Sequence, residues 1–122
     1  LNQPHTISPD SLAAMSDRPA IQTVSDNSFS LGGGEIQIYH ISSPHCAENL
    51  VVYVESVKLL FNADLFNPGL VPHGVAPPPF WLTYSRDCRK QVEALNLDIE
   101  VLLGAHGIPE GGPYQELIDF TE

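Results

Sequence analysis

Three residues that could ligate a transition metal stand beside hydrophobic segments of this chain. His45 precedes an apolar segment at residues 50–61, and Asp64 follows it directly. His106 comes after a second apolar run, residues 99–103, in a glycine-flanked loop. A strand end is a rigid platform, and a loop residue next to it inherits that rigidity. Imidazole and carboxylate groups are zinc ligands, so the pattern predicts a metal site built from three loops.

Each of the three residues also has an ordinary structural interpretation. His45 could be a surface residue before a strand, and His106 could be a loop histidine with local hydrogen bonds. Asp64 could open a turn, but a carboxylate among apolar residues is costly to bury unless it is paired or bound to a metal. We therefore take ligation as the stronger interpretation for all three.

The remaining histidines and the two cysteines fit structural roles better. His40 shares a predicted strand face with apolar residues, His5 lies in a polar segment, and His73 lies in a proline-rich loop where it could touch a substrate. Cys46 and Cys88 have no C-x-x-C spacing, which leaves two free thiols or one disulfide open. Two buried free thiols favour a reducing compartment, so we expect a cytoplasmic protein.

Hydrophobic periodicity predicts an α+β domain with helices on one face of a sheet. The expected strands cover residues 28–31, 35–41, 50–54, 58–61 and 99–103, and the expected helices cover residues 83–95 and 113–120. The first helix should be capped by Thr83 and bury Tyr84, Cys88, Val92 and Leu95. Phe80 and Trp81 are expected to pack at the start of this helix.

Two glycine- or proline-rich segments connect these elements. Gly32–Gly34 predicts a hairpin turn, because no Lys-Ser/Thr pair follows and the next element is a strand. Residues 67–79 contain five prolines and directly follow Asp64, a position suited to a lid that faces a substrate. Residues 1–19 are expected to be a linker or partly ordered segment, and residues 20–122 to form the domain.

Composition limits the possible partners. The chain of 122 residues is 43% hydrophobic and 16% charged, as a single globular domain would be. Its 5 basic and 15 acidic residues give a net charge of −10. Nucleic acids and anionic membranes would be repelled, so neither is an expected partner. No apolar run approaches the roughly 20 residues that span a bilayer.

The order His45, apolar hairpin, Asp64 and Gly-x-His106-Gly resembles the C-terminal half of the metallo-β-lactamase fold hydrolases. The resemblance covers roughly residues 20–121, and it implies half of that family's αββα sandwich. The family's first half carries a His-x-His-x-Asp-His motif, which this chain lacks: its five histidines include no pair spaced two apart. We therefore expect a fragment of such a hydrolase, or one chain of a divided protein.

The resemblance also implies a metal site and a partner. His45 would bind the first of two zinc or other divalent ions, His106 the second, and Asp64 would bridge them. The missing motif leaves the site incomplete, so we expect no hydrolysis of a small-molecule substrate by this chain alone. We expect an apolar sheet face, formed by Leu50, Val52, Val54, Leu60 and residues 99–103, to bind the missing half or a second copy.

Two other classes of protein remain open. The half-fold could be a non-catalytic binding or oligomerisation module with a degenerate metal site or none. Alternatively, an ordinary acidic α+β domain could carry coincidental histidines. That last hypothesis predicts that the side chains of His45, Asp64 and His106 lie apart.

Overall fold

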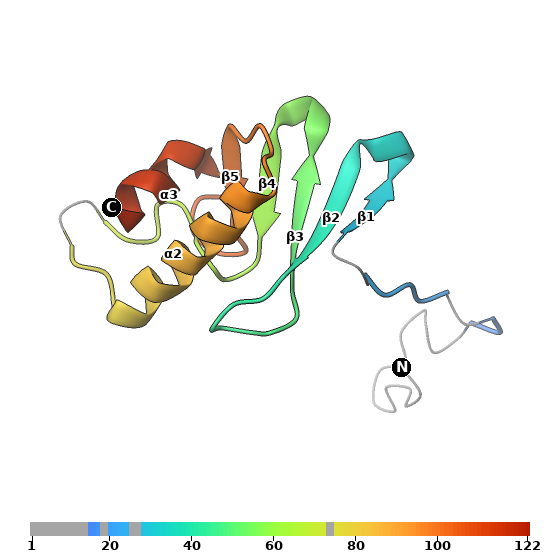
Figure 1. Ribbon diagram of the computed structural model, residues 1–122, viewed down its shortest axis with the longest axis horizontal. Coiled ribbons are helices and arrows are strands. Elements are labelled where there is room, and N and C mark those ends of the chain that lie inside the picture. The colour runs from blue at the N-terminus through green and yellow to red at the C-terminus, as the bar shows by residue number, and fades with distance from the viewer. Residues whose placement is uncertain (1–14, 18–19, 25–27, 73–74) are drawn as a thin grey trace.

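A computed structural model of the chain describes residues 15–17, 20–24, 28–72 and 75–122. Within them, a mixed sheet of six strands packs against two helices (Figure 1). The strands are β1 (Ser28–Leu31), β2 (Ile36–Ile41), β3 (Asn49–Val54), β4 (Leu59–Asn62), β5 (Val101–Leu103) and β6 (Gly112–Pro113). The helices are α2 (Pro79–Ala94) and α3 (Tyr114–Thr121), and two short 3₁₀ turns are η1 (Gly32–Gly34) and η2 (Glu55–Val57). The predicted α+β class is confirmed.

The strands lie in the sheet in the order of the sequence. Neighbouring strands are antiparallel except β4 and β5, which are parallel and are joined by the segment that contains α2. The turn at η1 closes the first hairpin as predicted, and all three of its glycines have positive φ (61°, 71° and 106°). Such angles are strained for other residues, which explains the triple glycine.

One face of the sheet meets both helices and holds the core. Its centre is fully buried and consists of Val51, Leu60 and Leu102 from the strands with Cys88, Val92 and Leu117 from the helices. Tyr53 lies beside them, and its hydroxyl donates to the Asp98 carbonyl at 2.9 Å. Because side chains alternate across a strand, the residues between these point to the opposite face.

We call that opposite side of the sheet the open face, because both helices lie on the other side (Figure 1). Pairing of Ile38 with Val52 and of Val52 with Phe61 aligns its residues across the strands. The open face consists of Phe29, Leu31, Ile36, Ile38, His40, Leu50, Val52, Val54, Leu59, Phe61, Val101 and Leu103. Of these twelve residues only His40 is polar. Such a face is unusually apolar for a surface that no described helix covers.

The composition of the open face corrects one expectation. Leu50, Val52 and Val54 lie on it as predicted, but Leu60 and Leu102 are fully buried under the helices. The cause is register: Leu60 pairs with Tyr53, so it shares the core face. A continuously apolar strand gives no alternation from which its inner face can be read.

Helix α2 also begins earlier than predicted. Thr83 is not its cap, because the helix starts at Pro79 and Thr83 donates to the Pro79 carbonyl from within the first turns. Proline is well suited to the first helical position, where its missing N–H costs nothing. The buried stripe is Ser85, Cys88 and Val92, whereas Tyr84 is only partly buried.

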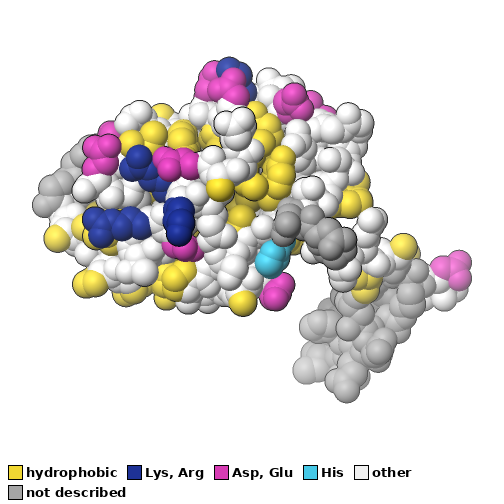
Figure 2. All heavy atoms as spheres, viewed as in Figure 1, with side chains coloured by type: hydrophobic (Ala, Val, Ile, Leu, Met, Phe, Trp, Pro, Cys, Tyr) yellow, Lys and Arg dark blue, Asp and Glu magenta, His cyan; other side chains and the backbone are white. Residues whose placement is uncertain are grey.

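The surface is acidic with one basic region. Figure 2 shows Lys and Arg side chains gathered over the helices, where Arg86, Arg89 and Lys90 lie in α2. Arg89 pairs with Glu93 at 2.8 Å. Neither α2 nor α3 has the length and hydrophobicity that a bilayer crossing requires. The cytoplasmic location stays a prediction.

The two thiols are free and differ in environment. Cys88 is buried, and burial followed by the charge of Asp87 raises the pKa of its thiol to about 12. Cys46 is exposed, contrary to the expectation of two buried thiols.

This difference predicts selective alkylation. At pH 8, iodoacetamide should modify Cys46 alone in the folded protein, because thiolate is the reactive form and Cys88 is both inaccessible and protonated. Mass spectrometry should find one adduct on the folded chain and two in urea. Two adducts under native conditions would contradict the burial of Cys88.

Candidate metal centre

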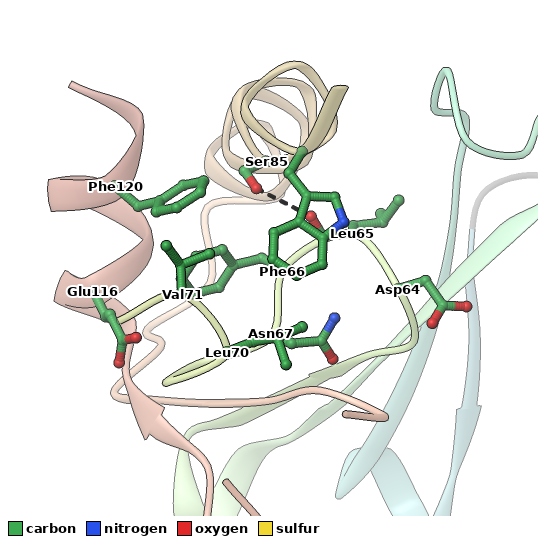
Figure 3. Close-up of a pocket in the computed structure, with 10 residues that line it drawn as sticks. Asp64, Leu65, Phe66, Asn67, Leu70, Val71, Ser85, Glu116 and Phe120 are labelled. Atoms are coloured by element: carbon green, nitrogen blue, oxygen red, sulfur yellow. Dashed lines mark hydrogen bonds between the residues drawn. The ribbon is translucent and has the colours of Figure 1, made fainter. Parts of the chain in front are cut away.

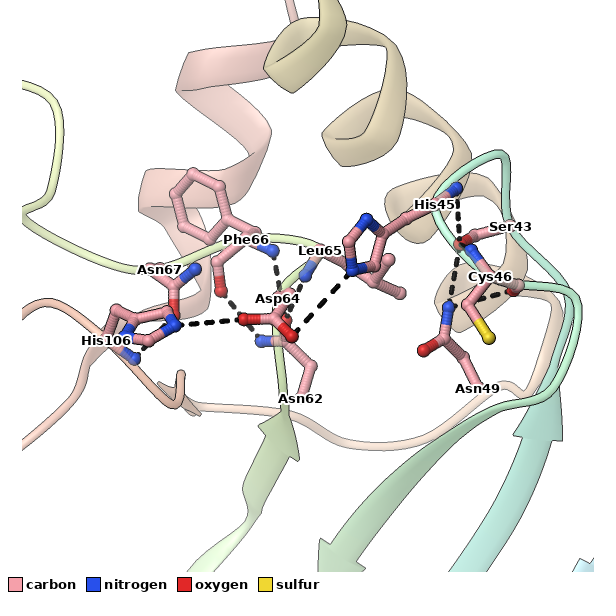
Figure 4. Close-up of polar contacts among 10 residues, drawn as sticks. All are labelled: Ser43, His45, Cys46, Asn49, Asn62, Asp64, Leu65, Phe66, Asn67 and His106. Atoms are coloured by element: carbon pink, nitrogen blue, oxygen red, sulfur yellow. Dashed lines mark hydrogen bonds and ion pairs between the residues drawn. The ribbon is translucent and has the colours of Figure 1, made fainter.

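The three predicted ligands come from three loops at one edge of the sheet (Figure 4). His45 lies in the loop between β2 and β3, Asp64 in the turn after β4, and His106 in the loop after β5. The parallel pairing of β4 with β5 brings the ends of these two strands to the same edge. The loop before β3 reaches that edge because β3 is antiparallel to β4.

The carboxylate of Asp64 lies between the two imidazoles. Its Oδ1 is 3.1 Å from Nε2 of His106, and its Oδ2 is 3.8 Å from Nε2 of His45. The side chains are 41% exposed for His45, 43% for Asp64 and 64% for His106. The hypothesis of coincidental histidines, which required these groups to lie apart, does not agree with this geometry.

A buried amide, Asn62, fixes the turn that carries Asp64. Asn62 is fully buried at the end of β4. Its Oδ1 accepts from the backbone N–H groups of Leu65 (3.2 Å) and Phe66 (2.9 Å), and its Nδ2 donates to the Phe66 carbonyl (2.9 Å). A short polar side chain that bonds the backbone ahead of it is a turn-forming device. It leaves the Asp64 side chain free to point outward.

A second amide, Asn67, connects this turn to the His106 loop. The backbone N–H of His106 donates to Oδ1 of Asn67 at 2.9 Å, and the Ala105 N–H donates to the Ala63 carbonyl at 3.0 Å. Gly104 is required here, because a Cβ on it would lie 2.1 Å from the Asn67 Oδ1. The loops of Asp64 and His106 are therefore joined by direct hydrogen bonds.

The His45 loop is organised by Ser43. Its Oγ accepts from the backbone N–H groups of His45 and Cys46, each at 3.2 Å, and from Nδ2 of Asn49 at 2.8 Å. The His45 ring lies 5.3 Å from the ring of Tyr84 in α2. The sulfur of Cys46 points away from Asp64 (Figure 4), so its thiol is not among the groups that face the carboxylate.

The one other histidine among the described residues, His40, is not part of this cluster. Nε2 of His40 lies 3.1 Å from the Glu48 carboxylate, on the open face. His5 and His73 fall outside the described residues. The sequence pattern identified the three potential ligands. It did not identify Asn62 and Asn67 as supports of their loops, or Tyr84 as a neighbour of His45. The signal for Asn62 was an asparagine that ends an apolar run three residues before a buried loop.

The donor chemistry fits zinc, but the donor count is half of a complete set. Ligands of one tetrahedral zinc lie about 3.4 Å apart, as its bond lengths of roughly 2.0–2.2 Å require. The two distances at Asp64, 3.1 and 3.8 Å, are near this value, yet each imidazole faces a different carboxylate oxygen. Each carboxylate oxygen of Asp64 therefore faces one imidazole, and among the described residues no group of three or more His, Cys, Asp or Glu is placed to hold one ion.

Comparison with solved structures identifies the architecture. DIM-1 metallo-β-lactamase superposes with a TM-score of 0.54 at 21% identity, over 85% of this chain and 48% of that one. A metallo-β-lactamase from Pontibacter korlensis gives 0.52 at 20% identity, over 86% and 48%. TMB-1 gives 0.54 at 24% identity, over 84% and 46%. No family model and no curated protein matches the sequence.

These superpositions define the class of fold. The chain spans about half the length of each of these structures, and its mixed sheet with two helices is about half of a metallo-β-lactamase fold. The resemblance inferred from the three ligands is therefore confirmed at the level of the fold.

The role of Asn62 generates a stability prediction. Asn62→Ala should lower the free energy of unfolding by at least about 2 kcal/mol, because two buried N–H groups lose their acceptor. Urea denaturation of both proteins measures the difference. Gln115→Ala removes an exposed side-chain hydrogen bond from α3 and should change stability by less than about 0.5 kcal/mol. Equal effects of the two substitutions would show that Asn62 has no special role.

Proposed function

We propose that this chain is the C-terminal part of a metal-dependent hydrolase related to the metallo-β-lactamases. One observation carries the proposal: a carboxylate stands between two imidazoles at the edge of a sheet that matches half of that fold. His45, Asp64 and His106 are this part's ligands to a dinuclear zinc site. The order of these residues along the chain supports the assignment to the C-terminal half.

The two oxygens of Asp64 support separate roles for the two histidines. His45, which faces Oδ2, and His106, which faces Oδ1, would each hold a divalent ion together with the Asp64 carboxylate. A bound divalent metal lowers the pKa of a coordinated water and polarises the substrate. The remaining ligands belong to the missing half, so this chain alone is not a competent hydrolase.

The missing half is also the proposed partner of the open face. The matched structures are about twice as long as the part that this chain covers, which leaves a segment of similar size to pack against it. Two sheets packed through apolar faces form a core about 10 Å thick. The apolar open face has the composition of one side of such a core.

A second candidate function rests on the same surface. The open face is apolar whether or not metal binds, which favours a non-catalytic module that keeps the half-fold for binding or oligomerisation. In that case the cluster at Asp64 is a structural contact or a degenerate site. Zinc affinity separates the two functions.

The zinc proposal predicts weak binding that depends on Asp64. Isothermal titration of the purified chain should detect zinc binding, and Asp64→Asn should weaken it by more than about tenfold, because the substitution removes the shared anionic ligand. Metal analysis after equilibrium dialysis against excess zinc gives the stoichiometry.

Glu48→Gln is the matched control. It removes a carboxylate that lies 3.1 Å from the single imidazole of His40, and it should leave zinc affinity unchanged. Stoichiometry near zero in the unmodified chain, or equal losses in the two variants, would mean that the cluster no longer binds metal.

The partner proposal predicts that the isolated chain associates or exposes apolar surface. In sedimentation velocity the chain should run larger than a monomer, or else bind an apolar fluorescent dye, because no described helix covers the open face. Val52→Glu places a charge at the centre of that face and should reduce both signals. Ser30→Glu, exposed on the other side of β1, should reduce neither. A monomer that binds no dye would contradict the proposal.

A further inference from the structure

An open cleft of about 430 Å³ lies beside the candidate metal centre. One side is formed by His45, Asp64 and His106, and the other side by Phe80, Trp81 and Tyr84 from the first turns of α2. Small-molecule sites usually have volumes of roughly 300–1,000 Å³ and combine apolar walls with a few polar groups. The cleft has both properties.

The aromatic side is a continuous row of rings that ends at His45. The ring of Phe80 lies 6.2 Å from that of Trp81 and 5.8 Å from that of Tyr84, and Tyr84 lies 5.3 Å from His45. These are tilted or edge-on contacts, in the range that aromatic pairs prefer. Phe80 nevertheless remains 53% exposed, so part of its ring has no apolar partner.

Packing of the helix start accounts for only part of this arrangement. Trp81 also lines an adjoining small pocket with Phe66 and Phe120, whose rings are 5.3 Å apart, and this pocket shares Asp64, Asn67 and Leu70 with the cleft (Figure 3). The Asp64 carboxylate points away from that pocket. Trp81 therefore packs on one side, as predicted from sequence, and borders the cleft on the other. Phe80 and Tyr84 do not line the inner pocket.

We propose that this cleft binds an uncharged small molecule through an aromatic group, which lies against Phe80, Trp81 and Tyr84. The described lining contains no Lys or Arg, and the chain carries a net charge of −10, so an anionic ligand is disfavoured in the metal-free chain. The position of the reacting group rests on the proposed hydrolase function: in such an enzyme this group of the substrate would point toward Asp64. The substrate class is then a compound with an aromatic substituent close to its scissile bond.

Trp81 is the single tryptophan of the chain, which makes its fluorescence a direct probe of this cleft. We would titrate the metal-free protein, in the presence of a chelator, with N-benzylacetamide. A saturable change is expected, with a Kd on the order of millimolar for a ligand of this size. The cyclohexylmethyl analogue should bind at least about twofold more weakly, because it lacks the ring contacts.

Variants locate the binding site. Phe80→Ala should weaken binding by about fivefold, because it removes one ring of the aromatic row. Phe80 is half-exposed, so its truncation should not unfold the chain, and circular dichroism checks this. Phe29→Ala removes an aromatic ring from the open face and is the matched control, with no change expected.

Two results would overturn the proposal. One is the absence of a saturable signal in the unmodified chain. The other is equal binding by the Phe80→Ala and Phe29→Ala variants, or by the benzyl and cyclohexylmethyl compounds. Because no metal is present, this outcome is independent of the zinc titration. A cleft that binds the probe in a chain that binds no zinc would refute the hydrolase proposal alone.

Discussion

The candidate site depends on the buried amide of Asn62. Where a strand ends inside a protein, the backbone N–H groups that follow it still need hydrogen-bond acceptors. Each buried N–H group without an acceptor costs about 1–3 kcal/mol of folding free energy. Asn62 solves this at the end of β4 by accepting from two N–H groups and donating to a carbonyl. The chain can then turn sharply, and Asp64 is presented at the rim although its neighbours Leu65 and Phe66 are buried.

The same turn fixes the second imidazole. Asn67 follows the turn and holds the backbone of His106, while Glu116 of α3 accepts from the Gly69 N–H at 2.7 Å. The geometry between Asp64 and His106 is therefore set by backbone contacts, not by the attraction between the two side chains. His45 depends on a different loop, stabilised by Ser43. This accounts for the longer distance of 3.8 Å on that side of the carboxylate, against 3.1 Å on the other.

The sequence predicted the parts of the structure that local patterns determine. Strand alternation in β2, the glycine turn at η1 and the approximate extent of the second hairpin were all readable. The three potential ligands were found because each stands next to an apolar run. The inner face of β4 could not be read, since all of Leu59, Leu60 and Phe61 are apolar and only the pairing with β3 decides which of them faces the helices.

Other details depend on contacts between distant segments. The start of α2 was predicted at Thr83 and lies at Pro79, because proline is common both in loops and at the first position of a helix. Asn67 acts through the backbone N–H of His106, 39 residues away, a relation that no local window contains. The aromatic row could not be predicted either. Spacing along α2 cannot show that Tyr84 faces His45, which lies in the loop between β2 and β3.

Under the proposed function, the apolar open face and the small number of metal donors would have a common physical origin. Both faces of this sheet are apolar, and a stable domain covers both. The loops that carry His45, Asp64 and His106 stand at the edge of the same layer, so a segment packed on the open face would also end near that edge. Its loops would bury side chains that are now 41–64% exposed and strengthen their electrostatic interactions with a metal. Covering the open face and completing the metal centre are then one event, and zinc affinity should rise with the partner that covers the sheet.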